Sequence, residues 1–278
     1  MTFFDLFKSI KKEYNNQAVN LAILFSLSKK VKSSKDLLMS HKHEIDFDSN
    51  DFYKDLDDYY LHHKPLAHIT HNTRFCDLDF IVHDTVHCPR NDTEVWVNQL
   101  LVLFLLDFQS TKLIDLCAGS GCIGITLKKY FNQFDLSLLE IDEKAINNIK
   151  ANLAFHHLDQ TKIIQDDFFN WIKNTNEKYD VIVMNPPYVD LKDLDQQMIK
   201  YENKISFNNS SDPLAFYKTL IPNLKKLIKD PNHFLVACEF GHDQKQALEK
   251  LINENGYKEL TTFYQDLNHK DRYFIIKK

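Results

Sequence analysis

The four residues 185–188, Asn-Pro-Pro-Tyr, are the part of this chain best suited to chemistry. They directly follow the apolar run 179–184, which predicts a buried strand. Two successive prolines fix φ and remove two N–H donors, so the carbonyl oxygens there stay available as acceptors. The asparagine adds another acceptor and the tyrosine ring a flat wall, which together can hold a planar –NH2 group by both hydrogens. We predict that the catalytic residues are Asn185, Pro186, Pro187 and Tyr188.

A second segment with chemical potential is the glycine-rich stretch 115–124. The chain has only 5 glycines, and three of them are Gly119, Gly121 and Gly124. This G-x-G-x-x-G spacing lies between a predicted strand and a predicted helix, where nucleotide-like ligands bind in doubly wound folds. The loop contains no Lys or Arg, which disfavours a triphosphate. A zwitterionic sulfonium ligand such as S-adenosylmethionine suits it better, with its carboxylate near the helix N-terminus and its ammonium near an acid such as Asp115.

Acidic and aromatic residues close the next two predicted strands. Glu140 can accept hydrogen bonds from both ribose hydroxyls, although it would also serve as the neighbour of a helix N-cap. Asp167 can accept from an adenine amino group and Phe168 can lie on the adenine face; the alternative is an acid at a strand end and an aromatic in the core. The predicted cofactor-binding residues are Asp115, Cys117, Ala118, Gly119, Ser120, Gly121, Glu140, Asp167, Phe168 and Asn185.

The elements that must position these residues alternate between strand and helix from residue 111 onwards. The expected strands are 112–116, 136–140, 161–165, 179–184, 234–239, 258–264 and 272–277, and the expected helices are 122–131, 143–154, 214–228 and 244–255. This alternation predicts an α/β fold with a doubly wound, Rossmann-like sheet of seven strands. The short loop before the last strand predicts an antiparallel pair at one edge.

Three parts are expected along the chain. Residues 1–63 show apolar positions at helical spacing and predict a small helical bundle. Residues 64–91 contain the alternating stretch 74–82 and predict a β-hairpin linker. Residues 92–278 begin with a helix near Asp92 and carry the α/β domain.

Composition narrows the classes of function. Hydrophobic residues make up 44% of the 278, enough for a sizeable core, but no apolar run approaches the ~18–20 residues that span a membrane. The first residues lack the pattern of a signal peptide. A net charge of −5 and only three arginines argue against extensive nucleic-acid contact.

The cysteines and histidines predict neither disulfides nor a metal site. Five cysteines is an odd number, and they form no C-x-x-C pair, which indicates a reducing cytoplasm. Cys76, His83, His87 and Cys88 lie near one another in sequence, but their spacing lacks the paired ligands of a zinc knuckle. We predict no metal.

Taken together, these motifs resemble those of the HemK/PrmC family, the glutamine methyltransferases of peptide chain release factors. Residues 185–188 match its N-P-P-Y without change, and 115–121 match D-[IL]-G-T-G-[ST]-G. Residues 89–94 match P-R-P-E-T-E with two substitutions, and 238–244 and 266–272 resemble L-E-I-G-x-x-Q and D-L-x-G-x-D-R. The resemblance covers nearly the whole chain.

The chain also departs from the family's pattern. Cys117 and Ala118 replace Gly and Thr, which tightens the space beside the methionine end of the cofactor. Glu202-Asn203 stands where the family has Glu-Pro, and 208–212 replaces a Gly-Gly-x-Asp-Gly segment. The loop after the catalytic motif is therefore expected to be organised differently.

The resemblance implies transfer of a methyl group from S-adenosyl-L-methionine to the N5 amide nitrogen of the glutamine in the GGQ motif of a release factor, with S-adenosyl-L-homocysteine as product. It implies a monomeric cytoplasmic enzyme without a stable nucleic-acid or membrane partner, whose helical bundle docks the substrate protein. For Arg90, Thr93 and Glu94, closing over the active site and simply starting a helix are equally good explanations.

Three other functions remain open. An RNA or DNA methyltransferase could use Asn185–Tyr188 on the exocyclic amino group of a flipped base. A dinucleotide-dependent oxidoreductase would account for the glycines but leave Asn185–Tyr188 unexplained. A non-catalytic member that binds a partner through its helical part would be consistent with the altered loop at 203–212.

Overall fold

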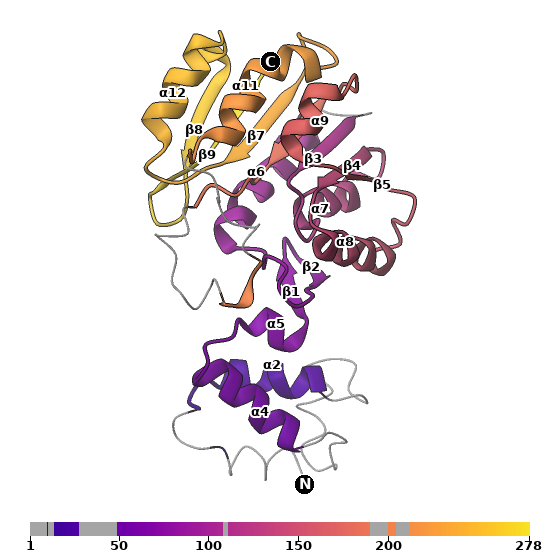
Figure 1. Cartoon of the computed structure of the whole chain (residues 1–278), viewed down its shortest axis with the longest axis vertical. Helices are drawn as coiled ribbons and strands as arrows, with labels where there is room; N and C mark the ends of the chain where they lie inside the picture. The colour runs from indigo at the N-terminus through magenta and orange to yellow at the C-terminus, as the bar shows by residue number, and fades with distance from the viewer. Residues whose placement is uncertain (1–9, 11–13, 28–48, 108–110, 190–199, 204–211) are drawn as a thin grey trace. The chain divides into compact units, whose positions relative to one another are not determined.

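The computed structural model describes residues 10, 14–27, 49–107, 111–189, 200–203 and 212–278 (Figure 1). The chain divides into two compact units, Met1–Thr73 and Arg74–Lys278, with the boundary inside the first strand. Of the substituted segment 208–212, residues 208–211 lie outside the described residues. None of the described helices has the length and apolar character needed to cross a membrane.

The first unit contains three described helices, α2 (Gln17–Leu27), α4 (Ser49–Tyr60) and α5 (Leu66–Thr70). They bury a hydrophobic cluster of their own, which includes Ile23, Phe52 and Leu56. The short helix α5 occupies part of the stretch that the sequence predicted to be only a hairpin linker. Five residues are too few to show a helical period, which is why the pattern missed it.

A hairpin spans the boundary between the units, and the second unit continues as an α/β domain. The hairpin consists of β1 (Asn72–Phe75) and β2 (Leu78–Ile81). The domain contains α6 (Asn91–Asp107), β3 (Lys112–Leu116), α7 (Cys122–Tyr130), β4 (Asp135–Glu140), α8 (Glu143–Phe155), β5 (Lys162–Gln165), α9 (Phe168–Asn174), β6 (Val181–Met184), α11 (Ala215–Leu227), β7 (Leu235–Glu239), α12 (Lys245–Glu254), β8 (Thr261–Gln265) and β9 (Asp271–Lys277).

The seven strands form one sheet in the order β5-β4-β3-β6-β7-β9-β8. The first five pair in parallel, whereas β9 pairs antiparallel with both β7 and β8. The strand order reverses at β3, whose neighbours are β4 on one side and β6 on the other. In open α/β sheets the ligand crevice lies outside the carboxyl ends of the strands at such a reversal.

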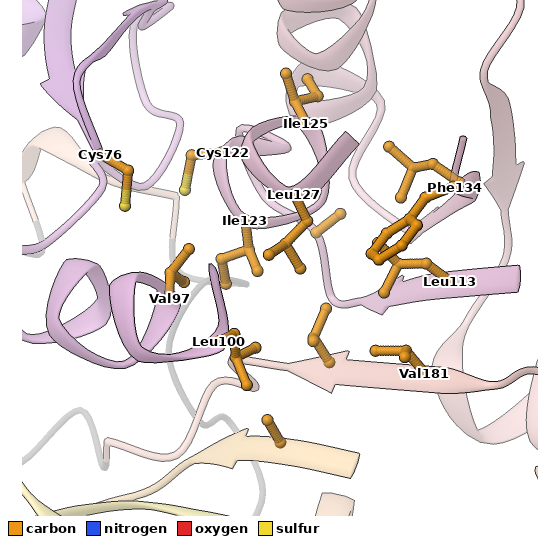
Figure 2. Close-up of a cluster of buried hydrophobic side chains, with 14 of the residues drawn as sticks. Cys76, Val97, Leu100, Leu113, Cys122, Ile123, Ile125, Leu127, Phe134 and Val181 are labelled. Atoms are coloured by element: carbon orange, nitrogen blue, oxygen red, sulfur yellow. The ribbon is translucent and has the colours of Figure 1, made fainter. Parts of the chain in front are cut away.

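Helices cover both faces of the sheet because successive strand residues point to opposite sides. On one face, Leu113 and Val181 belong to a hydrophobic cluster with side chains of α6, α7 and α8. Figure 2 shows Leu100 of α6 and Ile123 and Leu127 of α7 in this cluster. The alternate strand residues, such as Ile114 and Ile182, pack in the cluster that contains α9, α11 and α12. The predicted doubly wound, seven-stranded fold is confirmed.

In this domain one helix was missed and one predicted strand limit was wrong. Helix α9 was not expected, because its seven residues are too short for a clear period; the side chain of Asp167 caps it by accepting from the N–H of Asn170 at 2.9 Å. The strand expected from residue 258 begins at Thr261, because Lys258–Leu260 form a 3₁₀ turn. The last strand lies inside the sheet, and β8 alone forms that edge.

Candidate active site

A cavity of about 420 Å³ opens at the carboxyl ends of β3, β4 and β6. It brings together most of the residues that the sequence singled out. Those that line it are Cys117, Ala118, Gly119, Ser120, Glu140, Asp167, Phe168, Asn185, Pro186, Pro187 and Tyr188. The glycine loop and Asn185–Tyr188 therefore share one cavity, although about seventy residues separate them in the chain.

The glycine loop turns sharply between β3 and α7. Gly121 precedes α7 with φ +78°, a conformation that side chains rarely adopt. Gly124 serves a different purpose: a Cβ there would lie 2.7 Å from Leu138 Cδ2, so only glycine lets α7 approach the sheet this closely. Cys117 also has positive φ, at +58°, without being glycine. Because glycine adopts a positive φ without steric cost, this conformation explains why the family's pattern has glycine at position 117.

Two of the predicted cofactor-binding residues, Asp115 and Gly121, are not among the residues that line the cavity. The side chain of Asp115 is fully buried behind the loop, and its Oδ2 accepts from the N–H of Gly124 at 2.9 Å. Its Oδ1 has no partner among the described residues. Because β3 alternates its side chains between the two faces, Asp115 points towards α7 and holds the loop in place.

Glu140 ends β4 and ties two segments of the cavity together. Its Oε2 accepts from the N–H of Gly119 at 2.8 Å, and its Oε1 accepts from the N–H groups of Ile141 and Asp142. Burial raises the pKa of this carboxyl, although the three N–H groups act in the opposite direction. Asp142 is the N-cap of α8, and its N–H donates to Glu140. Glu140 therefore also has the alternative role, as the neighbour of a helix N-cap.

Aromatic rings form the wall next to Asp167. Phe168 is buried and its ring centroid lies 5.0 Å from that of Phe216 on α11. Phe216 lines the cavity and carried no sequence signal, because it stands in an ordinary amphipathic helix. Asp166, Ile141 and Asp142 also line the cavity and were missed. Their position beside the predicted residues was the only signal.

Asn185 is held by a chain of hydrogen bonds that ends at a buried glutamate. Its Nδ2 donates to Thr93 Oγ1 at 3.1 Å, and Thr93 donates to Glu239 Oε2 at 2.7 Å. Trp96 Nε1 donates to the same oxygen at 2.9 Å, and the hydroxyl of Tyr188 donates to Glu239 Oε1 at 2.8 Å. Among the described residues nothing donates to Asn185 Oδ1. Thr93 and Glu239 are therefore functional candidates. The sequence left Thr93 between closing over the active site and starting a helix, and Glu239 appeared only as part of the motif 238–244.

Tyr188 remains a hydrogen-bond donor. Burial, and then the neighbouring carboxylate of Glu239, raise its pKa well above the usual value for tyrosine. The backbone carbonyl of Tyr188 accepts from Gln244 Nε2 at 3.3 Å. Hydrogen bonds thus hold Tyr188 both at its hydroxyl and at its backbone carbonyl.

The segment 89–94 connects to three separate parts of the unit. Arg90 pairs with Glu202 at 2.5 Å, and Asp92 lies 3.5 Å from Arg272. Glu94 accepts from the N–H of Cys76 in the hairpin at 2.6 Å. Of the three residues with two possible roles, Glu94 thus anchors the hairpin, while Arg90 and Thr93 line the cavity.

The cavity's charges suit a cationic ligand. Four acids line the end near the glycine loop, Glu140, Asp142, Asp166 and Asp167, whereas the basic lining residues His87 and Arg90 both contact Glu202. Among the described lining residues, a dinucleotide pyrophosphate would find no lysine or arginine beside the glycines. An added Cβ at Gly119 would meet nothing within 4 Å, so a ligand can approach the backbone there. These residues are compatible with the ammonium, sulfonium, ribose and adenine of S-adenosylmethionine. The described residues contain no cluster of three or more potential metal ligands.

Comparison with solved structures identifies the fold. The S-adenosylmethionine-dependent methyltransferase from Agrobacterium tumefaciens shares the fold with a TM-score of 0.51 at 11% identity, over 74% of this chain and 69% of that one. SMU.776, crystallised with S-adenosylhomocysteine, gives 0.50 at 15% identity, over 73% and 55%. The family described as Methyltransferase small domain matches residues 92–204. The fold is that of the class I methyltransferases, which use S-adenosylmethionine.

Sequence relatives define the family. The release factor glutamine methyltransferase of Mycoplasma mycoides is 32% identical over 77% of this chain and 76% of its own length. That of Clostridium acetobutylicum is 29% identical over 95% and 93%. The chain belongs to the family of release factor glutamine methyltransferases. The predicted family, enzyme class and cofactor are confirmed.

Proposed function

We propose that this protein transfers the methyl group of S-adenosylmethionine to the side-chain amide nitrogen of the glutamine in the GGQ motif of a peptide chain release factor. The names of its relatives support this substrate. A relative from Francisella tularensis, 30% identical over 67% of this chain, is named for glutamine methylation of ribosomal protein uL3. In both the release factor and uL3, the group named as methylated is a glutamine.

The observation that carries the proposal is the state of Asn185. With its Nδ2 engaged by Thr93, its Oδ1 is left as an acceptor at the cavity end formed by Pro187 and Tyr188. The Pro186 carbonyl likewise accepts no hydrogen bond from the described residues. Two acceptors and a flat wall match the two hydrogens and the plane of a primary amide.

Holding the amide in this way addresses its weakness as a nucleophile. Its lone pair is delocalised into the carbonyl, and S-adenosylmethionine supplies an electrophilic methyl group. Asn185 Oδ1 and the Pro186 carbonyl each accept one amide hydrogen, which orients the nitrogen and stabilises the positive charge that develops on it. The proton can leave once the nitrogen is cationic, so no side-chain base is required.

The other parts of the chain have proposed roles of their own. Residues 1–63 dock the substrate protein, 64–91 link that bundle to the catalytic part, and 92–278 carry the reaction. The enzyme works as a monomer in the cytoplasm, without a stable nucleic-acid or membrane partner. Its cysteines are all free thiols, as the reducing compartment would keep them.

Methyl transfer from labelled S-adenosylmethionine tests the substrate. The assay offers purified release factor, the same factor with its GGQ glutamine replaced, ribosomal protein uL3, tRNA, rRNA and DNA in parallel. Label on the intact release factor, absent from the replaced one, is the expected result. Label on uL3 or on a nucleic acid instead would overturn the proposed substrate.

Asn185→Ala is expected to lower the rate constant for methyl transfer by on the order of a hundredfold or more, because one of the two acceptors is lost. S-adenosylmethionine binding, measured by calorimetry, should stay close to that of the wild type. Asn253→Ala, on the exposed surface of α12, is the matched control. Near-full activity in Asn185→Ala would show that this assignment is wrong.

A further inference from the structure

The hydrogen bonds behind Asn185 have a fixed direction. Trp96 Nε1 can only donate, so the oxygen of Glu239 that it contacts must accept. Thr93 donates its single hydroxyl proton to that same oxygen, at 2.7 Å. The hydroxyl oxygen of Thr93 is thereby left as an acceptor on its other side, where Asn185 lies.

The direction matters because an asparagine side chain has two ends of nearly equal shape. One end is an acceptor and the other carries two donors, so a rotation of half a turn exchanges them in place. Only a hydrogen-bond partner of defined polarity distinguishes the two orientations. Thr93 is the partner of Nδ2 in this structure, at 3.1 Å, and it is buried.

The wrong orientation would disable the site. Asn185 would then present N–H groups to the cavity, facing the N–H groups of the substrate amide that the proposed function places there. Donors would oppose donors, and the amide would not be held. The correct orientation is thus a condition for the reaction rather than for folding, because both orientations have the same volume.

We propose that Thr93, oriented by Glu239 and Trp96, is the positioning residue that keeps Asn185 Oδ1 facing the cavity. This inference rests on the proposed function for its catalytic consequence. The orientation itself does not depend on which substrate is methylated. Tyr188 is bound to the same glutamate, since its hydroxyl donates to the second carboxylate oxygen of Glu239 at 2.8 Å.

Two substitutions of Thr93 separate shape from polarity. Thr93→Val keeps the shape and removes the hydroxyl, and Thr93→Ser keeps the hydroxyl and removes a methyl group. Thr93→Val is expected to lower kcat on the order of tenfold to a hundredfold, because the acceptor is misplaced. The KM for the protein substrate should change far less than kcat. Thr93→Ser should recover most of that loss.

Glu239→Gln tests the part assigned to Trp96. A glutamine must place its amide oxygen beside Trp96 Nε1 and Thr93, and its –NH2 beside Tyr188. Thr93 would still find an acceptor there, so Asn185 should keep its orientation and only the bond to Tyr188 should be altered. Loss of the Asn185 orientation in this variant would contradict the role of Trp96.

The orientation is read directly from the side-chain amide of Asn185 by NMR. Protein labelled with ¹⁵N-asparagine gives a pair of –NH2 signals for Asn185, assigned by their absence in Asn185→Asp. These signals are expected to shift and to exchange faster with water in Thr93→Val, and to keep their wild-type positions in Thr93→Ser and Glu239→Gln. Thr262→Val, at an exposed site on β8, is the matched control.

The two readouts separate failure of this inference from failure of the proposed function. A wild-type enzyme that leaves the release factor unmethylated would overturn the function, while the NMR signals would still test the orientation. Unchanged Asn185 signals in a folded Thr93→Val, or a kcat within about threefold of the wild type with active substrate, would overturn the inference.

Discussion

Cys117 adopts a left-handed backbone conformation that glycine reaches without the steric cost paid by residues with a Cβ. Its φ of +58° costs a residue with a Cβ about 1–2 kcal/mol, whereas glycine loses about 0.5–1 kcal/mol through its greater freedom in the unfolded chain. Cys117→Gly is therefore expected to raise the free energy of unfolding by up to about 1.5 kcal/mol. Urea denaturation followed by circular dichroism measures this. Cys117→Ala keeps the Cβ and should give no such gain; equal stabilisation by both would point to the sulfur instead.

Asp115 makes stability depend on pH. Burial raises its pKa from 3.8 to about 7, against the lowering effect of the Gly124 N–H, while Glu140 raises it further. Between these two values the folded state binds a proton that the unfolded state has released, so this residue makes stability fall as pH rises from about 4 to about 7. Asp115→Asn should flatten the slope, measured by urea denaturation across that range. Asp159→Asn, at an exposed site, should leave the slope unchanged, and an unaltered slope in Asp115→Asn would refute the assignment.

The short segment 200–203 is held in place by residues that are far from it in the sequence. Glu202 is buried, pairs with Arg90 at 2.5 Å and with His87 at 2.6 Å, and its backbone bridges to Thr85. Asn203, which stands in place of the family's proline, donates to Asp142 Oδ2 at 2.9 Å. A proline has no such donor, so the substitution adds a contact to the wall of the cavity.

Glu202→Gln is expected to lower the free energy of unfolding by about 1.5–3 kcal/mol at neutral pH, since charged hydrogen bonds are lost. Burial raises the pKa of Glu202, but the His87 hydrogen bond and the charges of His87 and Arg90 together outweigh it, so the pKa lies below 4.5. The carboxylate's contribution is therefore complete above pH 4.5 and lost as pH falls through the lowered pKa. The difference from the wild type should shrink in acid, with Glu249→Gln as the exposed control. A difference that does not depend on pH would argue against the ion pair.

At the scale of the whole molecule, the cavity lies in the second unit, and no described residue of the helical first unit lines it. Each unit buries its own hydrophobic clusters, and every residue that lines the cavity belongs to Arg74–Lys278. A fragment that begins at Asn72, and so keeps both strands of the hairpin, is expected to fold and to bind S-adenosylmethionine as the full chain does.

Methylation of the release factor by this fragment should fall steeply, because the proposed docking part is missing. Calorimetry measures the binding, and the labelled-methyl assay measures the transfer. Full activity of the fragment on the release factor would contradict the docking role of residues 1–63, without affecting the assignment of the cavity.

The sequence by itself determined the α/β order, the carboxyl ends of most strands, and the two motifs that meet in the cavity. These depend on local rules: alternation within strands, helical periods, and the special backbone behaviour of glycine and proline. The short elements α5 and α9 escaped prediction because they contain too few residues to display a period. The family resemblance then supplied the reaction.

Tertiary structure alone decided which side chains cooperate. Thr93 meets Asn185 across 92 positions of sequence, and Arg90 meets Glu202 across 112. No local pattern could assign these partners, or reveal that Asp115 supports the glycine loop from behind, since each depends on which face of a strand or helix is turned towards the cavity. A hydrogen bond requires approach within about 3 Å and a defined direction, and only the folded chain sets both.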